Sequence, residues 1–182
     1  MERAIREWNI LATAQRRQEN CLLRFLRNSG EFWHSGYRDV VLGHVADVQA
    51  FLEALEDARL KKPGKLRPLG QVVPIEKNFQ FEAADFLDKA MEAVSPYIAR
   101  LEGSKFFVRV VRRGHKGEIS SQDTEKKLDS FILESLKKEG KEAKVNIEEF
   151  DLMIVLETAG NLAGIGIINR ELKAKYPFIK IK

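Results

Sequence analysis

The first 78 residues alternate short apolar runs with segments of helical spacing. Three apolar runs predict β-strands: residues 8–13 (WNILAT), 37–43 (YRDVVLG) and 71–76 (QVVPIE). Two segments predict helices: residues 14–29, which end before Gly30, and residues 45–60. Because Pro74 cannot donate to a strand ladder, we expect the third strand at a sheet edge or a bulge. This alternation predicts a small α+β sandwich, with one sheet covered by helices.

The rest of the chain predicts a second α+β unit. An apolar stripe over residues 83–94 predicts a helix, and Ser95-Pro96 is typical of the start of another short one. Ser120 and Asp123 resemble a capping box, so we expect a helix over residues 120–138. Three segments predict strands: residues 106–113 (FFVRVVRR), 150–157 (FDLMIVLE) and 163–168 (AGIGII). The second of these is apolar enough to be buried on both faces.

Length and composition fit two small domains, which we place at residues 1–78 and 79–182. The single cysteine, Cys21, excludes an internal disulfide and a cysteine-based zinc site, and its apolar neighbours predict a buried, inert thiol. No segment has the run of about 18 apolar residues that a membrane span needs, and the N-terminus is polar. We expect a cytoplasmic protein that does not associate with membranes.

No known catalytic motif is present. The glycines of residues 160–166 (GNLAGIG) do not form a dinucleotide-binding pattern, and no phosphate-binding P-loop occurs. The three histidines lie far apart in the sequence, and none belongs to a metal-binding motif. The carboxylates of Glu148, Glu149 and Asp151 are best explained as a solvated turn. We therefore predict no catalytic residues, no metal, no cofactor and no enzymatic activity.

Positive charge is concentrated at particular places although the net charge is only +4, from 31 Lys plus Arg and 27 Asp plus Glu. On a helix over residues 14–29, four arginines would share an arc of about 100° with no acid on it. They are Arg16, Arg17, Arg24 and Arg27. The alternative is an ordinary solvated helix face.

A second basic cluster follows the strand at residues 106–113. Its members are Arg109, Arg112, Arg113, His115 and Lys116. Gly114 and Gly117 bracket the turn and would leave backbone N–H groups open to a phosphate, which the arginines could bind in a bidentate manner. The alternative is a plain β-turn with exposed charges.

Two further clusters lie near the C-terminus and between the domains. The first consists of Arg170, Lys173 and Lys175, and the second of Lys61, Lys62, Lys65 and Arg67, for which a solvated loop is the simpler interpretation. Acidic residues gather elsewhere, on the helix that carries Glu53, Glu56 and Asp57. Such segregation of charge is typical of nucleic-acid-binding proteins.

Several segments resemble a THUMP-domain protein. Residues 106–114 look like the strand and Arg-Arg-Gly turn of that domain, and the helix from Ser121 and the strands at 150–157 and 163–168 follow in its order. Residues 8–13 and 72–75 look like the ferredoxin-like domain that precedes THUMP domains. The resemblance covers nearly the whole chain and implies an α+β fold, an N-terminal ferredoxin-like domain followed by a THUMP domain with a mixed sheet.

The resemblance implies binding of tRNA and its delivery to a modifying enzyme. The layout is similar to stand-alone THUMP proteins that act as tRNA-binding adaptors for a separate cytidine acetyltransferase, which forms N4-acetylcytidine. It implies a role for the Arg112-Arg113-Gly114 turn and its neighbours. The expected RNA-binding residues are Arg109, Arg112, Arg113, Gly114, His115, Lys116, Arg170, Lys173, Arg17, Arg24 and Arg27.

Three alternatives stay open. The chain could be the RNA-binding half of a split tRNA methyltransferase or thiouridylase. It could be a stand-alone enzyme whose site assembles in space from Glu148, Asp151 and His115. It could also be a protein-interaction module with incidental basic patches. The sequence carries no signal for an oligomeric state.

Overall fold

The computed structural model describes residues 5–181 and divides into two compact units. One unit runs to Ile75 and includes the C-terminal segment from Leu172, and the other spans Glu76–Glu171. The sequence-based division had assigned that C-terminal segment to the second domain. The segment joins the first unit through contacts that a sequence pattern does not show: the Val72 amide donates to the Phe178 carbonyl, and the Gln49 side chain donates to the Tyr176 hydroxyl.

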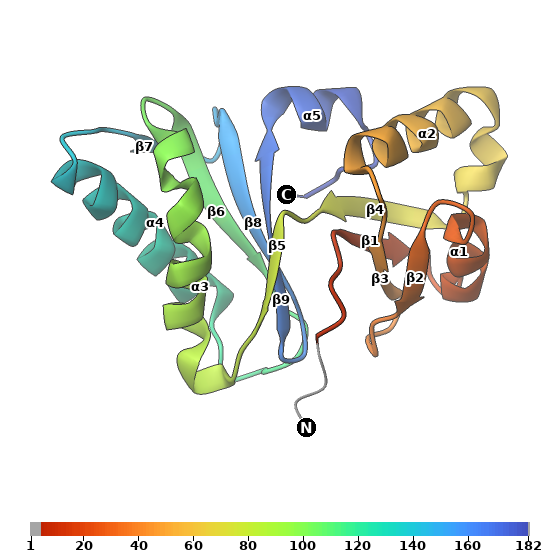
Figure 1. The fold of residues 1–182 in the computed structure, drawn as a ribbon, viewed down its shortest axis with the longest axis horizontal. Helices are drawn as coiled ribbons and strands as arrows, with labels where there is room; N and C mark the ends of the chain where they lie inside the picture. Colours follow the sequence, from red (N-terminus) through yellow and green to blue (C-terminus); the bar gives the residue numbers. More distant parts are fainter. Residues whose placement is uncertain (1–4, 182) are drawn as a thin grey trace. The chain divides into compact units, whose positions relative to one another are not determined.

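The first unit is ferredoxin-like. Its elements follow the order β-α-β-β-α-β: β1 (Ile10–Ala14), α1 (Glu19–Leu26), β2 (Glu31–His34), β3 (Val40–His44), α2 (Val48–Lys61) and β4 (Leu69–Pro74), with a 3₁₀ turn, η1 (Pro63–Leu66), before β4. The sheet is antiparallel with strand order β2-β3-β1-β4, so β4 lies at an edge, as Pro74 predicts. Figure 1 shows these elements in red to yellow.

Three expectations for this unit are wrong. The first helix begins at Glu19 and not at residue 14, because the polar residues 15–18 form a turn held by tertiary hydrogen bonds, such as Arg17 N–H to Asp39. Cys21 is exposed, because Leu22 and Leu26 take the buried face of the short helix. Gly30 is not the helix cap; a Cβ there would lie 2.4 Å from the His44 carbonyl oxygen, so the residue permits close strand contact.

The second unit is a mixed sheet with strand order β5-β9-β8-β6-β7. Its strands are β5 (Lys77–Gln80), β6 (Lys105–Val111), β7 (Lys144–Val145), β8 (Leu152–Ala159) and β9 (Leu162–Asn169). β6 is parallel to β7 and β8, whereas β9 is antiparallel to β8 and β5. The helical segments are η2 (Ala83–Asp85), α3 (Phe86–Val94), η3 (Ser95–Leu101) and α4 (Ser121–Lys138); a short helix, α5 (Arg170–Lys175), follows β9.

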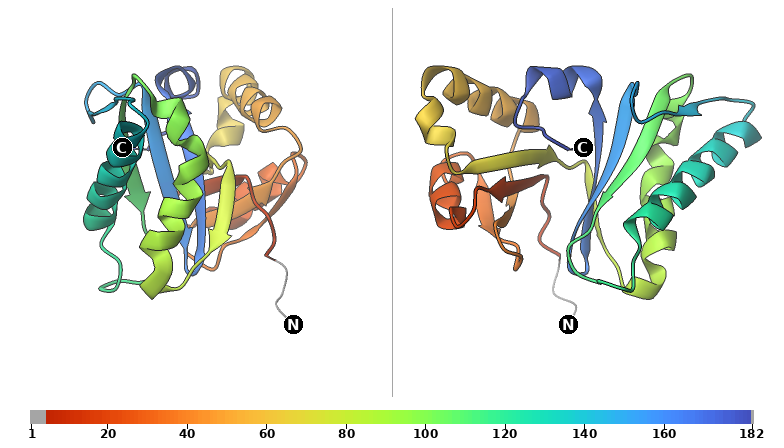
Figure 2. Two further views of the ribbon diagram at one scale, coloured as in Figure 1. Left: turned by 60° about the vertical axis from the view of Figure 1, so that its left-hand side comes forward. Right: turned by 180° about the vertical axis from the view of Figure 1, so that it is seen from behind.

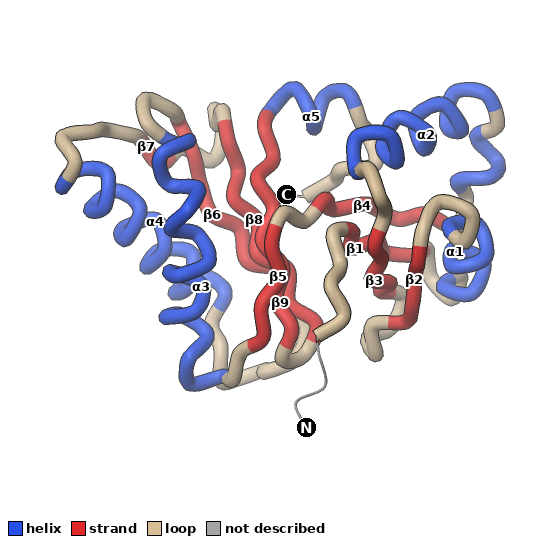
Figure 3. Tube along the Cα trace, viewed as in Figure 1, coloured by secondary structure: helices blue, strands red, loops and turns tan. Residues whose placement is uncertain are grey.

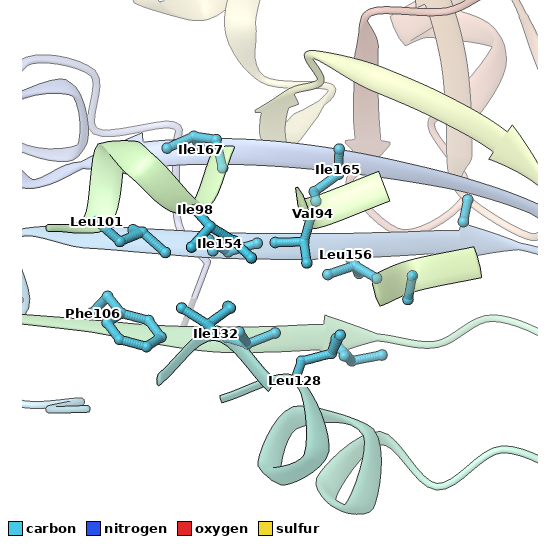
Figure 4. Close-up of a cluster of buried hydrophobic side chains, with 14 of the residues drawn as sticks. Val94, Ile98, Leu101, Phe106, Leu128, Ile132, Ile154, Leu156, Ile165 and Ile167 are labelled. Atoms are coloured by element: carbon cyan, nitrogen blue, oxygen red, sulfur yellow. The ribbon is translucent and has the colours of Figure 1, made fainter. Parts of the chain in front are cut away.

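Helices α3 and α4 cover one face of this sheet. Both views of Figure 2 place them side by side, and the two helices are in contact. Figure 4 shows the core between them and the strands, where Ile132 of α4 lies beside Phe106 of β6 and Leu128 lies further along the same strand. The predicted helix cap at Ser120 is confirmed, since its side chain accepts from the Asp123 amide. β8 is buried almost throughout, as expected from its continuous apolar run. The short elements β2, β5, β7 and α5 were not predicted, because four residues or fewer, or a polar six-residue helix, carry little periodicity.

The outer edge of β6 is closed by carboxylates of α4. Beyond Phe106 this strand has no further pairing with β7, so its outward N–H groups need other acceptors. Asp129 accepts from the Val108 amide at 3.2 Å, and Glu125 accepts from the Val110 amide at 2.8 Å. Burial raises the pKa of Asp129 to about 6, opposed by the Val108 hydrogen bond and supported by the neighbouring Glu125 charge.

We predict that Asp129 makes the second unit less stable as pH rises. Its folded-state pKa lies above its ordinary value, so the native state binds the proton more tightly and loses that advantage between about pH 4 and pH 6. Asp129→Asn keeps an acceptor for Val108 without the buried charge. Relative to wild type, it should gain about 1–3 kcal/mol of unfolding free energy at pH 7 and nothing at pH 4.

Urea unfolding followed by far-UV circular dichroism measures this difference, since both tryptophans, Trp8 and Trp33, lie in the other unit. Glu134→Gln, at an exposed position of the same helix, is the matched control and should show no such pH dependence. A variant-minus-wild-type difference that stays constant from pH 4 to pH 7 would contradict the assignment.

Candidate nucleic-acid interface

The turn that follows β6 has an unusual backbone. Gly114, His115 and Gly117 all have positive φ angles, of 92°, 51° and 84°. Glycine adopts positive φ angles freely, whereas residues with a side chain do so less often. The backbone of His115 must therefore be stabilised by its surroundings. Figure 3 shows the turn in tan, between β6 and α4. We call residues 112–117 the basic turn.

Arg113 anchors the basic turn to β8. Its guanidinium is paired with the Glu157 carboxylate, which is completely buried, while 15% of the Arg113 side chain is exposed. Its amide donates to the Thr158 hydroxyl at 2.8 Å, and its carbonyl accepts from the Gly160 amide at 3.0 Å. Burial raises the pKa of Glu157, and the Arg113 charge opposes that rise. Arg113 was predicted to bind RNA, but the structure commits its side chain to an internal ion pair.

His115 fixes the other side of the turn. Its ring nitrogens lie 3.0 Å from a Glu118 oxygen and 2.7 Å from the Asn161 side-chain oxygen, and its ring contacts Phe81. The hydrogen bonds to Glu118 and Asn161 raise the pKa of His115. Asn161 follows Gly160 in the two-residue turn that joins β8 to β9. The side chain of His115 therefore holds this unusual backbone in place.

The remaining groups of the basic turn have few internal partners among the described residues. The amides of residues 114–117 donate to no acceptor within residues 5–181. Lys116 is exposed and has no ion-pair partner in that range, and the Arg112 guanidinium meets only the Gly114 carbonyl. Consecutive amides without an internal acceptor in a turn with positive φ angles, with a lysine and an arginine beside them, suit the binding of a phosphate group.

Arg109 lies on β6, three residues before the basic turn begins at Arg112. Its guanidinium is 3.5 Å from Glu125 and lies over the Phe107 ring at 5.4 Å, with 28% of the side chain exposed. It contributes positive charge near the turn while remaining tied to α4.

The C-terminal basic residues have partners of their own. Arg170 donates to the Phe150 carbonyl next to the start of β8, whereas the turn lies beside the end of that strand. Lys173 belongs to the first unit and donates to the Ile181 carbonyl at 2.6 Å, and Lys175 is paired there with Glu53.

The arginines of the first unit do not form the predicted helical stripe. Arg16 and Arg17 lie in the turn before α1, where Arg17 has a φ of 62°. Arg24 and Arg27 are exposed at the end of α1, without a carboxylate partner in the described part of the chain. The 100° arc therefore holds for two of the four arginines only.

The trio proposed for a stand-alone enzyme is not assembled. Asp151 accepts from the Lys105 amide at the start of β6, whereas His115 follows the end of that strand. Over residues 5–181 no group of histidine, cysteine and carboxylate side chains is placed to hold a metal ion. No helix within that range is both long and apolar enough to span a membrane.

Comparison with known families identifies the second unit. Residues 82–168 match the family model of the THUMP domain, so the chain contains a THUMP domain. Together with the ferredoxin-like first unit, this confirms the predicted fold class. A comparison of the sequence with curated proteins gives no match.

Solved structures share this fold over most of the chain. PH1313 from Pyrococcus horikoshii has a TM-score of 0.63 at 14% identity, covering 89% of this chain and 54% of its own. TrmN from Thermus thermophilus has a TM-score of 0.63 at 17% identity, covering 88% and 45%. A 4-thiouridine synthetase, solved in complex with RNA and ATP, has a TM-score of 0.54 at 14% identity, covering 89% and 41%. The chain thus spans about half the length of these proteins or less.

We predict that Arg113 contributes mainly to the stability of the fold and not to the binding of RNA. Arg113→Ala leaves the Glu157 carboxylate buried without its partner and should lower the unfolding free energy by about 3–5 kcal/mol. Arg113→Ala combined with Glu157→Gln should recover part of this loss, because the buried charge is gone. Arg112→Ala, at the neighbouring surface position, should cost less than about 1 kcal/mol. Urea unfolding followed by circular dichroism tests all three, and an Arg113→Ala protein as stable as Arg112→Ala would refute the anchoring role.

Proposed function

We propose that this protein is a non-catalytic tRNA-binding protein that presents tRNA to a separate modifying enzyme, a cytidine acetyltransferase that forms N4-acetylcytidine. The observation that carries the proposal is the basic turn of the THUMP domain, with its free amides at residues 114–117 and the cations Arg112 and Lys116. One of the similar solved structures, the 4-thiouridine synthetase, is itself an RNA complex.

The groups of the basic turn suit the binding of a phosphate and not the catalysis of proton transfer. Amide dipoles and cations stabilise an anion, whereas proton transfer at neutral pH needs a group poised to gain or lose a proton beside the substrate. His115 is the titratable ring in the turn, and both of its nitrogens are occupied by Glu118 and Asn161. A phosphate contact of this kind positions a nucleic acid without reading its bases.

The proposed partner follows from the resemblance to stand-alone adaptors for cytidine acetylation. A second candidate is the RNA-binding half of a split tRNA methyltransferase or thiouridylase. It is favoured by the fold shared with the 4-thiouridine synthetase and with a protein assigned as a methyltransferase and solved with SAH.

We predict that Arg112→Ala with Lys116→Ala weakens tRNA binding and lowers its salt dependence. Each lost phosphate contact should reduce the slope of log K against log salt by about 0.7–0.9, so the pair should lose roughly 1.5. Arg113 stays unchanged, so that a loss of binding is not a loss of folding. Filter binding to total tRNA over a salt series measures both quantities.

The matched control removes two cations from the other unit, by Lys62→Ala with Lys65→Ala; neither lysine has an ion-pair partner in the described residues. If both double variants show the same slope as wild type, the basic turn does not bind phosphate. If wild type binds tRNA no better than an equal-length DNA duplex, the proposed function itself fails.

Activity assays separate the candidates for the partner. The chain alone, given tRNA with acetyl-CoA or S-adenosylmethionine, should modify nothing. Addition of the chain to a tRNA cytidine acetyltransferase should stimulate formation of N4-acetylcytidine. Stimulation of a methyltransferase or a thiouridylase instead would select the second candidate, and turnover by the chain alone would overturn the non-catalytic assignment.

A further inference from the structure

Helix α4 separates its charges between two faces. The inner face is buried through Thr124, Leu128, Ile132 and Leu136. Beside it, Glu125 and Asp129 turn toward the edge of β6, where they accept from backbone amides. These two carboxylates are thereby removed from the outer surface of the helix.

The outer face of α4 carries two pairs of exposed lysines, one near each end of the helix. Lys126, Lys127, Lys137 and Lys138 are exposed and fall within an arc of about 120° at 100° per residue. None has a carboxylate partner among residues 5–181, although Asp123 and Glu134 lie on the same arc. Lys126 and Lys127 line a shallow hollow of about 290 Å³, together with Met91, Ser130, Phe131 and the carboxylate of Glu134.

A larger groove lies where α4 ends. Its volume is about 640 Å³, and its lining includes Lys105, Lys137, Lys141 and Lys144, with Leu133 and Ala143 between them. Lys105 is paired with Glu149, and Lys141 is shared between Glu102 and Glu139. Lys137 and Lys144 have no such partner within the described chain, so they are free to bind an external anion.

The outer face of α4 connects the basic turn to this groove. The helix begins at Ser121, four residues after Gly117, and its 18 residues extend for about 27 Å. The groove lies beside Lys105, at the start of β6, and the basic turn follows the end of the same strand. We call the exposed lysines of α4 together with Lys105, Lys141 and Lys144 the lysine track.

We propose that tRNA bound at the basic turn continues along the lysine track, and that Lys137 and Lys144 hold phosphates in the groove. This inference rests on the proposed function and adds a second contact region to it. Phosphates on one strand of a duplex recur about every 3.4 Å along the axis, so the 27 Å track corresponds to roughly eight of them.

The charge of the track favours RNA over an acidic protein segment only through its two lysine clusters. Lys126 with Lys127 and Lys137 with Lys138 lie about 15 Å apart along the helix, and four of the nine residues that line the groove are lysines against one acid, Glu142. Exposed Val145 and Ile147 follow directly along the chain and would be the natural apolar contacts of a protein partner. The experiment therefore has to separate these two occupants.

The test is tRNA binding by Lys137→Ala with Lys144→Ala in the full chain, over the same salt series. Loss of two phosphate contacts should lower the salt slope by about 1.4–1.8 and weaken binding at 0.1 M salt by roughly tenfold or more. Lys126→Ala with Lys127→Ala should give a loss in the same direction. Lys62→Ala with Lys65→Ala removes the same charge elsewhere and should change little, and circular dichroism melts establish that each variant is folded.

The outcomes distinguish the lysine track from a protein-docking surface and from a failure of the proposed function. If wild type binds tRNA and the Lys137/Lys144 pair behaves like the Lys62/Lys65 pair, the lysine track is refuted while the proposed function stands. If that pair binds tRNA normally but no longer supports the partner enzyme, the groove is a protein-docking surface and the RNA assignment is overturned. If wild type does not bind tRNA, the proposed function fails first, and this inference falls with it.

Discussion

The buried ion pair between Arg113 and Glu157 is the interaction on which the candidate site depends. A carboxylate without solvent access is costly unless it is paired, so this pair fixes where β6 stops and how the chain leaves the sheet. The amide and carbonyl of Arg113 are bonded to the adjoining β8–β9 hairpin, and His115 is bonded to Asn161 of the same hairpin. With both sides held, the backbone between them keeps its positive φ angles and its outward amides. A phosphate meeting such a turn finds its donors already in place, which reduces the ordering that binding requires.

Helix α4 also divides its charged residues between two roles. Its carboxylates Glu125 and Asp129 bind the edge of β6, whereas its lysines lie on the outer face. Glu125 and Asp129 satisfy the amides of an open strand edge that would otherwise be a site for unwanted strand pairing. Because these acids are turned inward, the lysines on the outer face have few carboxylates to pair with. A chain with a net charge of only +4 can therefore leave an excess of lysines over acids on one helix face.

Much of this fold could be predicted from the sequence, because its main elements carry their own signals. The helix cap at Ser120, the long apolar run of β8 and the edge proline Pro74 each have local physical causes, and the structure agrees with them. The start of α1 could not be predicted, because the turn before it is held by contacts distant in sequence, such as the Arg17 amide with Asp39. The role of Arg113 was hidden for the same reason. A run of arginines beside glycine indicates a basic turn, but only the position of Glu157 on the neighbouring strand shows which arginine is used internally.

The lysines of α4 illustrate the opposite failure. Their sequence, with four acids and four lysines in residues 121–138, looks like an ordinary solvated helix with balanced charge. The folded structure removes this balance of charge in two ways. The burial of Leu128 and Ile132 fixes which side of the helix faces outward, and two of the acids accept hydrogen bonds from amides of β6. Charge counting along a sequence cannot make this distinction, since it weighs a carboxylate that caps a backbone amide equally with one that neutralises a lysine. What decides the electrostatic character of a surface is which charges the fold has already used, and in α4 these are two of the four acids, Glu125 and Asp129.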